Sequence, residues 1–142
     1  MPARRTESLH HHRLSVAGAA YFVTCATSPR KYGLTNRAPA LSLGEAARAS
    51  DFNGETTTFA FTVMPDHCHW LFQLRSVLPL GRVIAKFKFF TKLALQTQDI
   101  AWQRDFYEHV VRSDENLNAI RAYIQANPAR WAEDVENPLK RP

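Results

Sequence analysis

The chain has 142 residues, of which 45% are hydrophobic and 22% charged, and its net charge is +5. This length suits one domain with a single core, so the sequence predicts one domain over residues 1–142. The composition excludes a disordered chain, no apolar run is long enough for a membrane span, and two cysteines are too few for a disulfide scaffold. The basic N-terminus lacks the apolar region of a secretory signal, and we therefore expect a cytoplasmic protein.

The first half of the chain predicts three strands and one helix. Residues 20–26 are rich in β-forming side chains and predict a first strand. A loop through Pro39 follows, and an Ala-rich stretch over 41–50 predicts a short helix. After a turn signal, β-rich runs at 56–63 and 67–74 predict a pair of strands.

The second half predicts two helices separated by a strand. Apolar residues recur at helical spacing over 80–98, and residues 106–112 are typical of a strand. Ser113 has the character of an N-cap, so the last helix is expected to begin there. It is expected to end before Pro128, because proline disfavours helical geometry in the residue that precedes it.

The order of these elements predicts the fold class. The sequence β-α-β-β-α-β-α contains the ferredoxin-like arrangement β-α-β-β-α-β. We therefore expect an α+β fold, in which an antiparallel sheet has helices on one face and a further helix follows at the C-terminus. Residues 129–142 are polar and are expected to form a loose tail.

The basic residues are concentrated in two tracts. Residues 1–37 hold six basic side chains against one acidic side chain, and residues 75–98 hold five with no acid. Such tracts on a small domain are typical of proteins that bind a polyanion, most often a nucleic acid. The alternative is a solvated helix face that contributes only to solubility.

A His-x-His motif lies at the start of the second strand of the pair. Side chains alternate between the faces of a strand, so His67 and His69 are expected on one side and Cys68 on the other. Two imidazoles on one face can bind one divalent ion, with a third ligand from elsewhere. The alternative is a pair of surface or hydrogen-bonded histidines.

The last helix carries a second pair of polar side chains. Tyr123 and Asn127 are four residues apart, so they lie one turn apart on one flank of the helix. A phenol and an amide would then face the same neighbour. The alternative is that Tyr123 packs over the sheet and Asn127 caps the end of the helix.

Taken together, these motifs resemble a known family. Pro-Asp-His-Cys-His-Trp at 65–70 resembles the Pro-Asn-His-x-His signature of the HUH single-tyrosine transposases. Within that group, the segments at 102–112 and 123–128 resemble the REP-associated tyrosine transposases, and residues 18–24 are similar to the first strand of that family. The motifs occur in the family's order and cover most of the chain.

The resemblance implies a ferredoxin-like enzyme that nicks single-stranded DNA beside short imperfect hairpins. It implies that His67 and His69 hold Mg²⁺ or Mn²⁺ with Asn127 as third ligand, and that Tyr123 is the nucleophile. Asp66 stands where the family more often has asparagine, and the C-terminal tail is short beside those of longer members.

The implied reaction is a transesterification of a DNA phosphodiester. Attack by Tyr123 would give a 5′-phosphotyrosine and a free 3′-hydroxyl, and the reverse step would rejoin strands. A phenol has a pKa of about 10, so it needs a base or an in-line placement to react. The base is left open between a metal-bound water and His109, and Tyr107 is an alternative nucleophile that we expect to be structural.

Contacts to DNA phosphates are expected from basic side chains of the predicted helix over 80–98 and of the segment around the following strand. The candidates are Arg82, Lys86, Lys88, Lys92, Arg104 and Arg112. Each has the alternative of an ordinary surface charge. Trp70 and Trp102 are expected in the core rather than stacked on bases, and both cysteines are expected to be buried.

Two other functions compete with the transposase hypothesis. One is a non-catalytic protein that binds nucleic-acid hairpins, for which replacing Tyr123 by phenylalanine would change nothing. The other is a small metallohydrolase or oxygenase that uses His67, His69 and a carboxylate ligand, a role for which Asp66 is poorly directed at the adjacent strand position. The sequence leaves open whether the protein is a monomer or a homodimer. A location in the bacterial cytoplasm, at the nucleoid when bound to DNA, follows from the resemblance.

Overall fold

The computed structural model describes residues 16–28, 31–75, 78–112 and 114–133, with the backbone alone at 114–115 and 127–133. Strands and helices follow one another along these residues in the predicted order. They are β1 (Ala20–Ala26), α2 (Arg37–Phe52), β2 (Thr56–Met64), β3 (His67–Leu74), α3 (Leu80–Gln96), β4 (Tyr107–Val111) and α4 (Asp114–Glu133).

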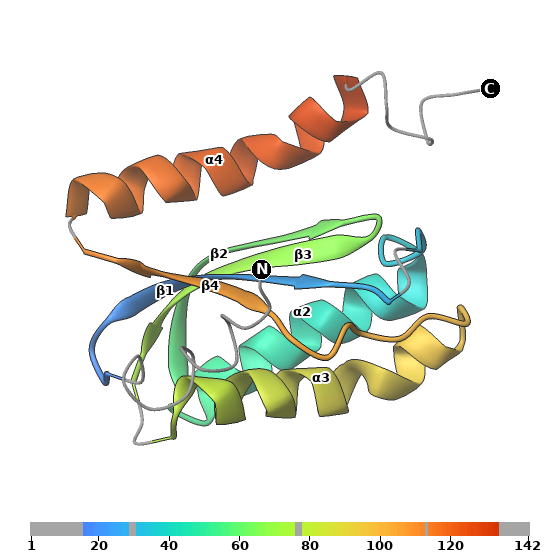
Figure 1. The fold of residues 1–142 in the computed structure, drawn as a ribbon, viewed down its shortest axis with the longest axis horizontal. Coiled ribbons are helices and arrows are strands. Elements are labelled where there is room, and N and C mark those ends of the chain that lie inside the picture. Colours follow the sequence, from blue (N-terminus) through green and yellow to red (C-terminus); the bar gives the residue numbers. More distant parts are fainter. Residues whose placement is uncertain (1–15, 29–30, 76–77, 113, 134–142) are drawn as a thin grey trace.

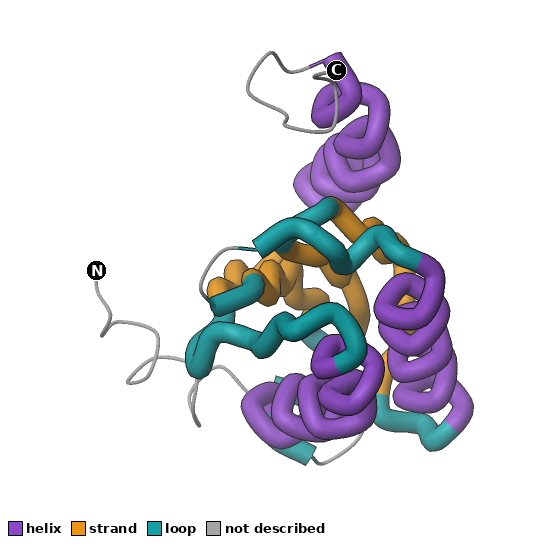
Figure 2. Tube along the Cα trace, turned by 90° about the vertical axis from the view of Figure 1, so that its right-hand side faces the viewer, coloured by secondary structure: helices purple, strands orange, loops and turns teal. Residues whose placement is uncertain are grey.

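The four strands form one antiparallel sheet in the order β2-β3-β1-β4 (Figure 1). This is the strand order of a ferredoxin-like fold, and it confirms the predicted fold class. Helices α2 and α3 cover one face of the sheet, while α4 lies on the opposite face (Figures 1 and 2). The C-terminal helix therefore does not join the other two helices on their face.

The main core fills the space between the sheet and the helices α2 and α3. Alternate residues of β1 and β3 point into it, including Tyr21, Trp70 and Phe72, which are almost fully buried. A smaller second cluster lies under α4 and consists of Ala60, Leu71, Val111 and Ile124. The face of the sheet opposite α2 and α3 is thus covered by α4 alone among the described helices, through a small apolar contact (Figure 1).

A β-bulge in β2 changes which residues of that strand face α4. Thr58 pairs with Phe72, but the pairing resumes at Ala60 opposite Leu71, so one extra residue is inserted at this point. Because side chains alternate along a strand, the extra residue reverses the alternation beyond it. Thr58 therefore lies on the side of Trp70, to whose indole it is hydrogen-bonded, whereas Thr62 lies on the side of α4.

Helix α2 is longer than predicted and begins before Pro39. The sequence analysis placed Pro39 in a loop, but this proline is the third residue of the helix. Amides in the first turn have no partner within the helix, so a proline there removes no hydrogen bond. The predicted start at residue 41 is therefore wrong by one turn.

Helix α4 continues beyond the predicted stop and ends at Glu133. The expectation that it ends before Pro128 is wrong, and residues 129–133 belong to the helix rather than to a loose tail; residues 134–142 lie outside the described part. Pro128 cannot donate to the carbonyl of Ile124, four residues earlier. That carbonyl instead accepts a hydrogen bond from Thr62 Oγ1 at 3.0 Å. No helix in the described ranges is long and apolar enough to cross a bilayer.

Candidate functional site

The His-x-His motif lies on β3, the strand between β2 and β1. His67 and His69 lie on the face covered by α4, and their ring centroids are 4.8 Å apart. Cys68 lies between them and points into the main core, where it is 1% exposed. The predicted separation of the two histidines from Cys68 is confirmed.

Each of the two histidines has a hydrogen-bond partner at its Nδ1 atom. Asp66 Oδ1 lies 2.8 Å from Nδ1 of His67, and Thr24 Oγ1 lies 2.9 Å from Nδ1 of His69. Such contacts at one ring nitrogen orient an imidazole that ligates a metal through the other. When Nδ1 carries the proton and donates it, Nε2 of each ring is left with a lone pair for a ligand.

His69 is the more buried of the two histidines. Burial, followed by the charge of His67, lowers the pKa of His69 to about 4. Phe22 contributes to this burial, because its ring centroid lies 5.2 Å from that of His69. His69 is therefore neutral at pH 7, which is the form that binds a metal ion.

Tyr123 of α4 lies against this pair. Its ring centroid is 6.2 Å from that of His69, with an angle of 56° between the ring planes. The Tyr123 side chain is 43% exposed, so solvent and substrate can reach it. The fold thus brings the predicted nucleophile and both predicted metal ligands together, although Tyr123 and His69 are more than fifty residues apart in sequence.

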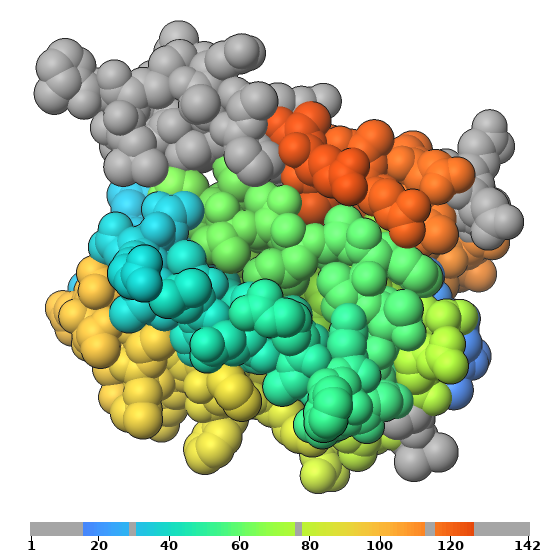
Figure 3. Space-filling view, turned by 180° about the vertical axis from the view of Figure 1, so that it is seen from behind, coloured from blue at the N-terminus to red at the C-terminus, as the bar shows by residue number. Residues whose placement is uncertain are grey.

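Helix α4 reaches this position by packing along β2. Figure 3 shows α4, in orange to red, lying over the green surface of the β2–β3 region. Among the described side chains of α4, Ile124 is the one that is fully buried, and it follows Tyr123 directly. Asn127, the predicted third ligand, is one turn further along the backbone of α4, and its side chain lies outside the described part.

The chemistry of the donor set fits a weakly held divalent cation. Two imidazole ligands bring no negative charge to a cation and leave positions open for oxygen ligands. Within the described residues, no third histidine, cysteine, aspartate or glutamate completes a cluster around His67 and His69. The carboxylate of Asp66 contacts Nδ1 of His67, on the side of the ring away from Nε2. This contact argues against Asp66 as the carboxylate ligand that the metallohydrolase alternative needs.

The basic residues of α3 lie on the other side of the sheet from the histidines. Arg82 and Lys92 are exposed, whereas Lys86 is ion-paired with Glu55. The ammonium of Lys88 donates to the backbone carbonyls of residues 103, 104 and 105 at 2.8, 3.2 and 3.1 Å. The four predicted DNA contacts of this helix are therefore not equivalent, and none of them lines the His–Tyr site.

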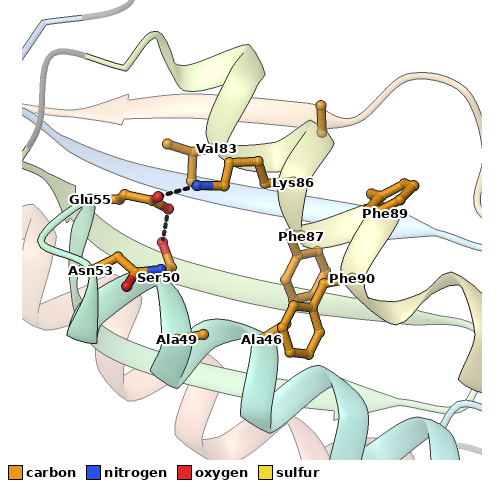
Figure 4. A pocket seen from close by; sticks show the side chains of 11 residues that line it. Ala46, Ala49, Ser50, Asn53, Glu55, Val83, Lys86, Phe87, Phe89 and Phe90 are labelled. Atoms are coloured by element: carbon orange, nitrogen blue, oxygen red, sulfur yellow. Dashed lines mark hydrogen bonds and ion pairs between the residues drawn. The ribbon is translucent and has the colours of Figure 1, made fainter.

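Figure 4 shows the groove between α2 and α3 that contains Lys86. It has a volume of about 320 Å³ and is lined mainly by apolar side chains. At one end, Glu55 accepts hydrogen bonds from Lys86 and from Ser50. The groove lies on the face opposite to the histidines, so it is not part of the candidate site.

Arg104 and Arg112 lie near opposite ends of β4, and both are exposed. The strand register puts Arg104 toward the end of the sheet that carries His67, because Thr27 bridges to Trp102 and Ala26 pairs with His67. Arg112 follows Val111, which pairs with Ala20 at the far end. Only Arg104 is therefore near the histidine end of the sheet.

The remaining aromatic candidates fall into two groups. Trp70 is in the main core, and the partly buried Trp102 packs against it through Phe87, as predicted. Tyr107 is 54% exposed, although a structural role was expected. The register places Tyr107 opposite Thr24 and His109 opposite Phe22, so both are on the face that carries His69.

Sequence reasoning missed the residues that support the histidines and the helix. The position of Asp66 directly before His67 was a usable signal, because an adjacent carboxylate can reach an imidazole. Thr24 and Thr62 gave no signal, since their roles depend on strand pairing and on the bulge in β2.

Comparison with known proteins agrees with this geometry. Residues 16–127 match the sequence profile described as "Transposase IS200 like". A REP-associated tyrosine transposase bound to a REP hairpin has a similar fold, with a TM-score of 0.69, 23% identity, and 84% of this chain and 72% of the other covered. A protein from Deinococcus radiodurans R1, described as a candidate transposase, has a TM-score of 0.57 at 18% identity over 80% and 94% of the two chains.

One curated relative also matches. An uncharacterized protein of Haemophilus influenzae is 29% identical over 99 residues, and the match covers 52% of this chain and 55% of that protein. The match therefore spans little more than half of the relative's length. The profile match, by contrast, extends over most of the present chain, from β1 into α4. The protein belongs to the IS200-like transposase family.

Proposed function

We propose that this protein is a metal-dependent endonuclease and strand transferase that cleaves single-stranded DNA beside hairpin sequences of the REP type. The observation that carries the proposal is the contact between Tyr123 and the His67–His69 pair, with ring centroids 6.2 Å and 4.8 Å apart. A phenol beside two imidazoles is the set of groups that a tyrosine transesterase needs.

His67 and His69 would hold Mg²⁺ or Mn²⁺ through their Nε2 atoms, with the Asn127 amide as third ligand. When bound, the ion polarises the scissile phosphate and offsets the charge that develops on its oxygens. Asp66 and Thr24 orient the two imidazoles from behind through the Nδ1 atoms. The low pKa of His69, about 4, keeps this ligand neutral throughout the physiological range.

Tyr123 performs the covalent step. Its Oη atom attacks the phosphorus, a bond between Oη and phosphorus forms, and the bond from phosphorus to the 3′-oxygen breaks. The phenolic proton passes to a base, the 3′-oxygen leaves as a hydroxyl after taking up a proton, and the DNA 5′-end stays on Tyr123. His109, which is exposed on the same sheet face, is one candidate for the base.

The proposed substrate is consistent with the shape of this face. The similar REP-associated transposase is bound to a REP hairpin, and we extend this partner to the present chain. Helix α4 packs mainly on β2, and Tyr107 of β4 remains 54% exposed beside the site. An unpaired strand can therefore approach Tyr123 from the side of β4, where exposed aromatic rings can stack on bases.

A covalent-trapping assay tests the proposal. The full chain is mixed with single-stranded oligonucleotides that contain a hairpin and flanking bases, labelled at the 5′- or 3′-end, with Mn²⁺ or EDTA. We expect a Mn²⁺-dependent adduct that carries only the 3′-side label, present in Tyr107→Phe and absent in Tyr123→Phe. If the adduct is absent in Tyr107→Phe and present in Tyr123→Phe, the nucleophile is Tyr107 and the assignment of Tyr123 is wrong. Hairpin binding with no adduct in any variant would instead support the non-catalytic binding protein.

A further inference from the structure

A hydrogen bond between β2 and α4 ends at the residue next to Tyr123. Thr62 Oγ1 donates to the carbonyl oxygen of Ile124 at 3.0 Å, and the contact is buried. In an uninterrupted helix this carbonyl would receive the amide of residue 128. Residue 128 is a proline, which has no N–H, so the carbonyl is available to a donor from outside the helix.

The position of Thr62 links this bond to the histidines. Thr62 pairs with His69 in the β2–β3 register, and the bulge between Thr58 and Ala60 turns it toward α4. The bond therefore joins Thr62, which is paired with the predicted ligand His69, to Ile124, which follows the predicted nucleophile Tyr123. Among the described residues, α4 also packs on the sheet through the apolar cluster around Ile124, and Arg121 lies over the ring of Phe59. A hydrogen bond is directional, so it restrains the rotation and shift of the helix in a way that apolar packing does not.

We propose that Thr62 and Pro128 act together as positioning residues for Tyr123. Pro128 frees the Ile124 carbonyl, and Thr62 uses it to fix the rotation and shift of α4, which holds the Tyr123 ring beside His69. This inference rests on the proposed function, in which Tyr123 is the nucleophile. Neither residue touches the phosphate, so both act on the reaction through the placement of Tyr123.

Four variants separate positioning from simple stabilisation. Thr62→Val has the shape of threonine but cannot donate, so it removes the tether and leaves a buried carbonyl unsatisfied. In the double variant Thr62→Val/Pro128→Ala, the alanine amide satisfies the Ile124 carbonyl within the helix, but the tether to β2 is still absent. Thr62→Ser keeps the donor, and Pro128→Ala alone keeps both Thr62 and an intact helix.

We expect Thr62→Val to slow adduct formation roughly 10- to 100-fold at saturating DNA, the scale of a small misplacement of a reacting group. Hairpin affinity should stay within about twofold, because no DNA-contacting group is changed. The double variant should regain the melting temperature of the wild type and still cleave slowly, whereas Thr62→Ser should cleave like the wild type. Restored cleavage in the double variant would overturn the proposal, as would wild-type cleavage in Thr62→Val.

A readout that does not depend on activity keeps this inference separate from the proposed function. The proton contact between the Tyr123 and His69 rings is measured by nuclear Overhauser effects in the wild type, Thr62→Ser and the double variant. We expect it in the first two and its loss in the double variant. If it persists in the double variant, the positioning role is wrong. If the wild type forms no adduct but the contact follows the tether, the proposed function fails and the positioning device stands.

Discussion

Replacing Lys88 by methionine is expected to lower stability and leave DNA binding intact. The ammonium of Lys88 contacts three consecutive carbonyls of the loop before β4 and lies 5.7 Å from the centre of the Phe106 ring. Burial lowers its pKa, which shows that its charge is partly removed from water. Methionine keeps most of the apolar stem but removes every donor to the loop. Lys92, one turn later and exposed, is the matched control.

The size of the effect follows from the groups that lose their partner. Hydrogen bonds to a charged group contribute about 1.5–3 kcal/mol, and the cost of burying the ammonium offsets part of this. The carbonyls of Gln103 and Arg104 can turn to water when the ammonium is removed, because both residues are exposed. We therefore expect a loss of about 2 kcal/mol, which for a chain of this size corresponds to a fall of about 6 °C in melting temperature. Lys92→Met should change the stability by less than about 0.5 kcal/mol.

Thermal unfolding followed by circular dichroism and a hairpin-binding titration are measured on both variants. We expect opposite patterns in the two variants. Lys88→Met loses stability and keeps its affinity for the hairpin, whereas Lys92→Met keeps its stability, and any loss of affinity is confined to this variant. A Lys88→Met protein that melts like the wild type but binds DNA more weakly would show that this ammonium faces the DNA and not the loop.

Three further predictions concern the site and its helix. The pKa of His69 is about 4 in the folded protein and 6.5 in the unfolded chain, so the unfolded state takes up a proton first as the pH falls. The metal-free protein should therefore lose about 2 kcal/mol of stability between pH 7 and pH 5, measured by urea unfolding, and His69→Gln should show a smaller change of stability with pH. Asp66→Ala should weaken Mn²⁺ binding at least about tenfold by calorimetry, whereas Asp66→Asn keeps an acceptor for Nδ1–H of His67 and should lose less affinity. If Asp66→Ala binds Mn²⁺ as tightly as the wild type, Asp66 does not orient His67. Ile124→Ala should cost about 3 kcal/mol and speed hydrogen exchange in α4, and a loss below about 1 kcal/mol would mean that the helix is held elsewhere.

The parts of the fold that could be predicted are those with local periodic signals. The alternation along β3 placed His67 and His69 on one face, and the order of the elements was sufficient for the ferredoxin-like topology. The approach of Tyr123 to His69 could not be derived from spacing, because it depends on how α4 packs across the sheet; only the family resemblance suggested it.

Other features depend on contacts between residues that are far apart in the sequence. A lysine on a helix is normally solvated, and nothing in the local sequence around Lys88 indicates that loop carbonyls will bind its ammonium. Pro128 was expected to end α4, but the helix continues to Glu133. The donor that satisfies the Ile124 carbonyl, Thr62, is supplied by a strand some sixty residues earlier. The bulge in β2 likewise has no sequence marker such as glycine.

The central position of β3 restricts how this active face can change in evolution. The strand is paired along its length with both β1 and β2. Its histidines point to one side of the sheet, and Cys68 and Trp70 point to the other side, into the core. A single insertion or deletion in β3 would reverse the faces to which these side chains point, so that imidazoles would enter the core and apolar side chains would enter the candidate site. Helix α4 has a much smaller contact and can drift in angle or length while the sheet stays intact. Changes in the position of Tyr123, the proposed nucleophile, should therefore accumulate in α4 and in its hydrogen bond to Thr62, while the spacing of the two histidines stays constant.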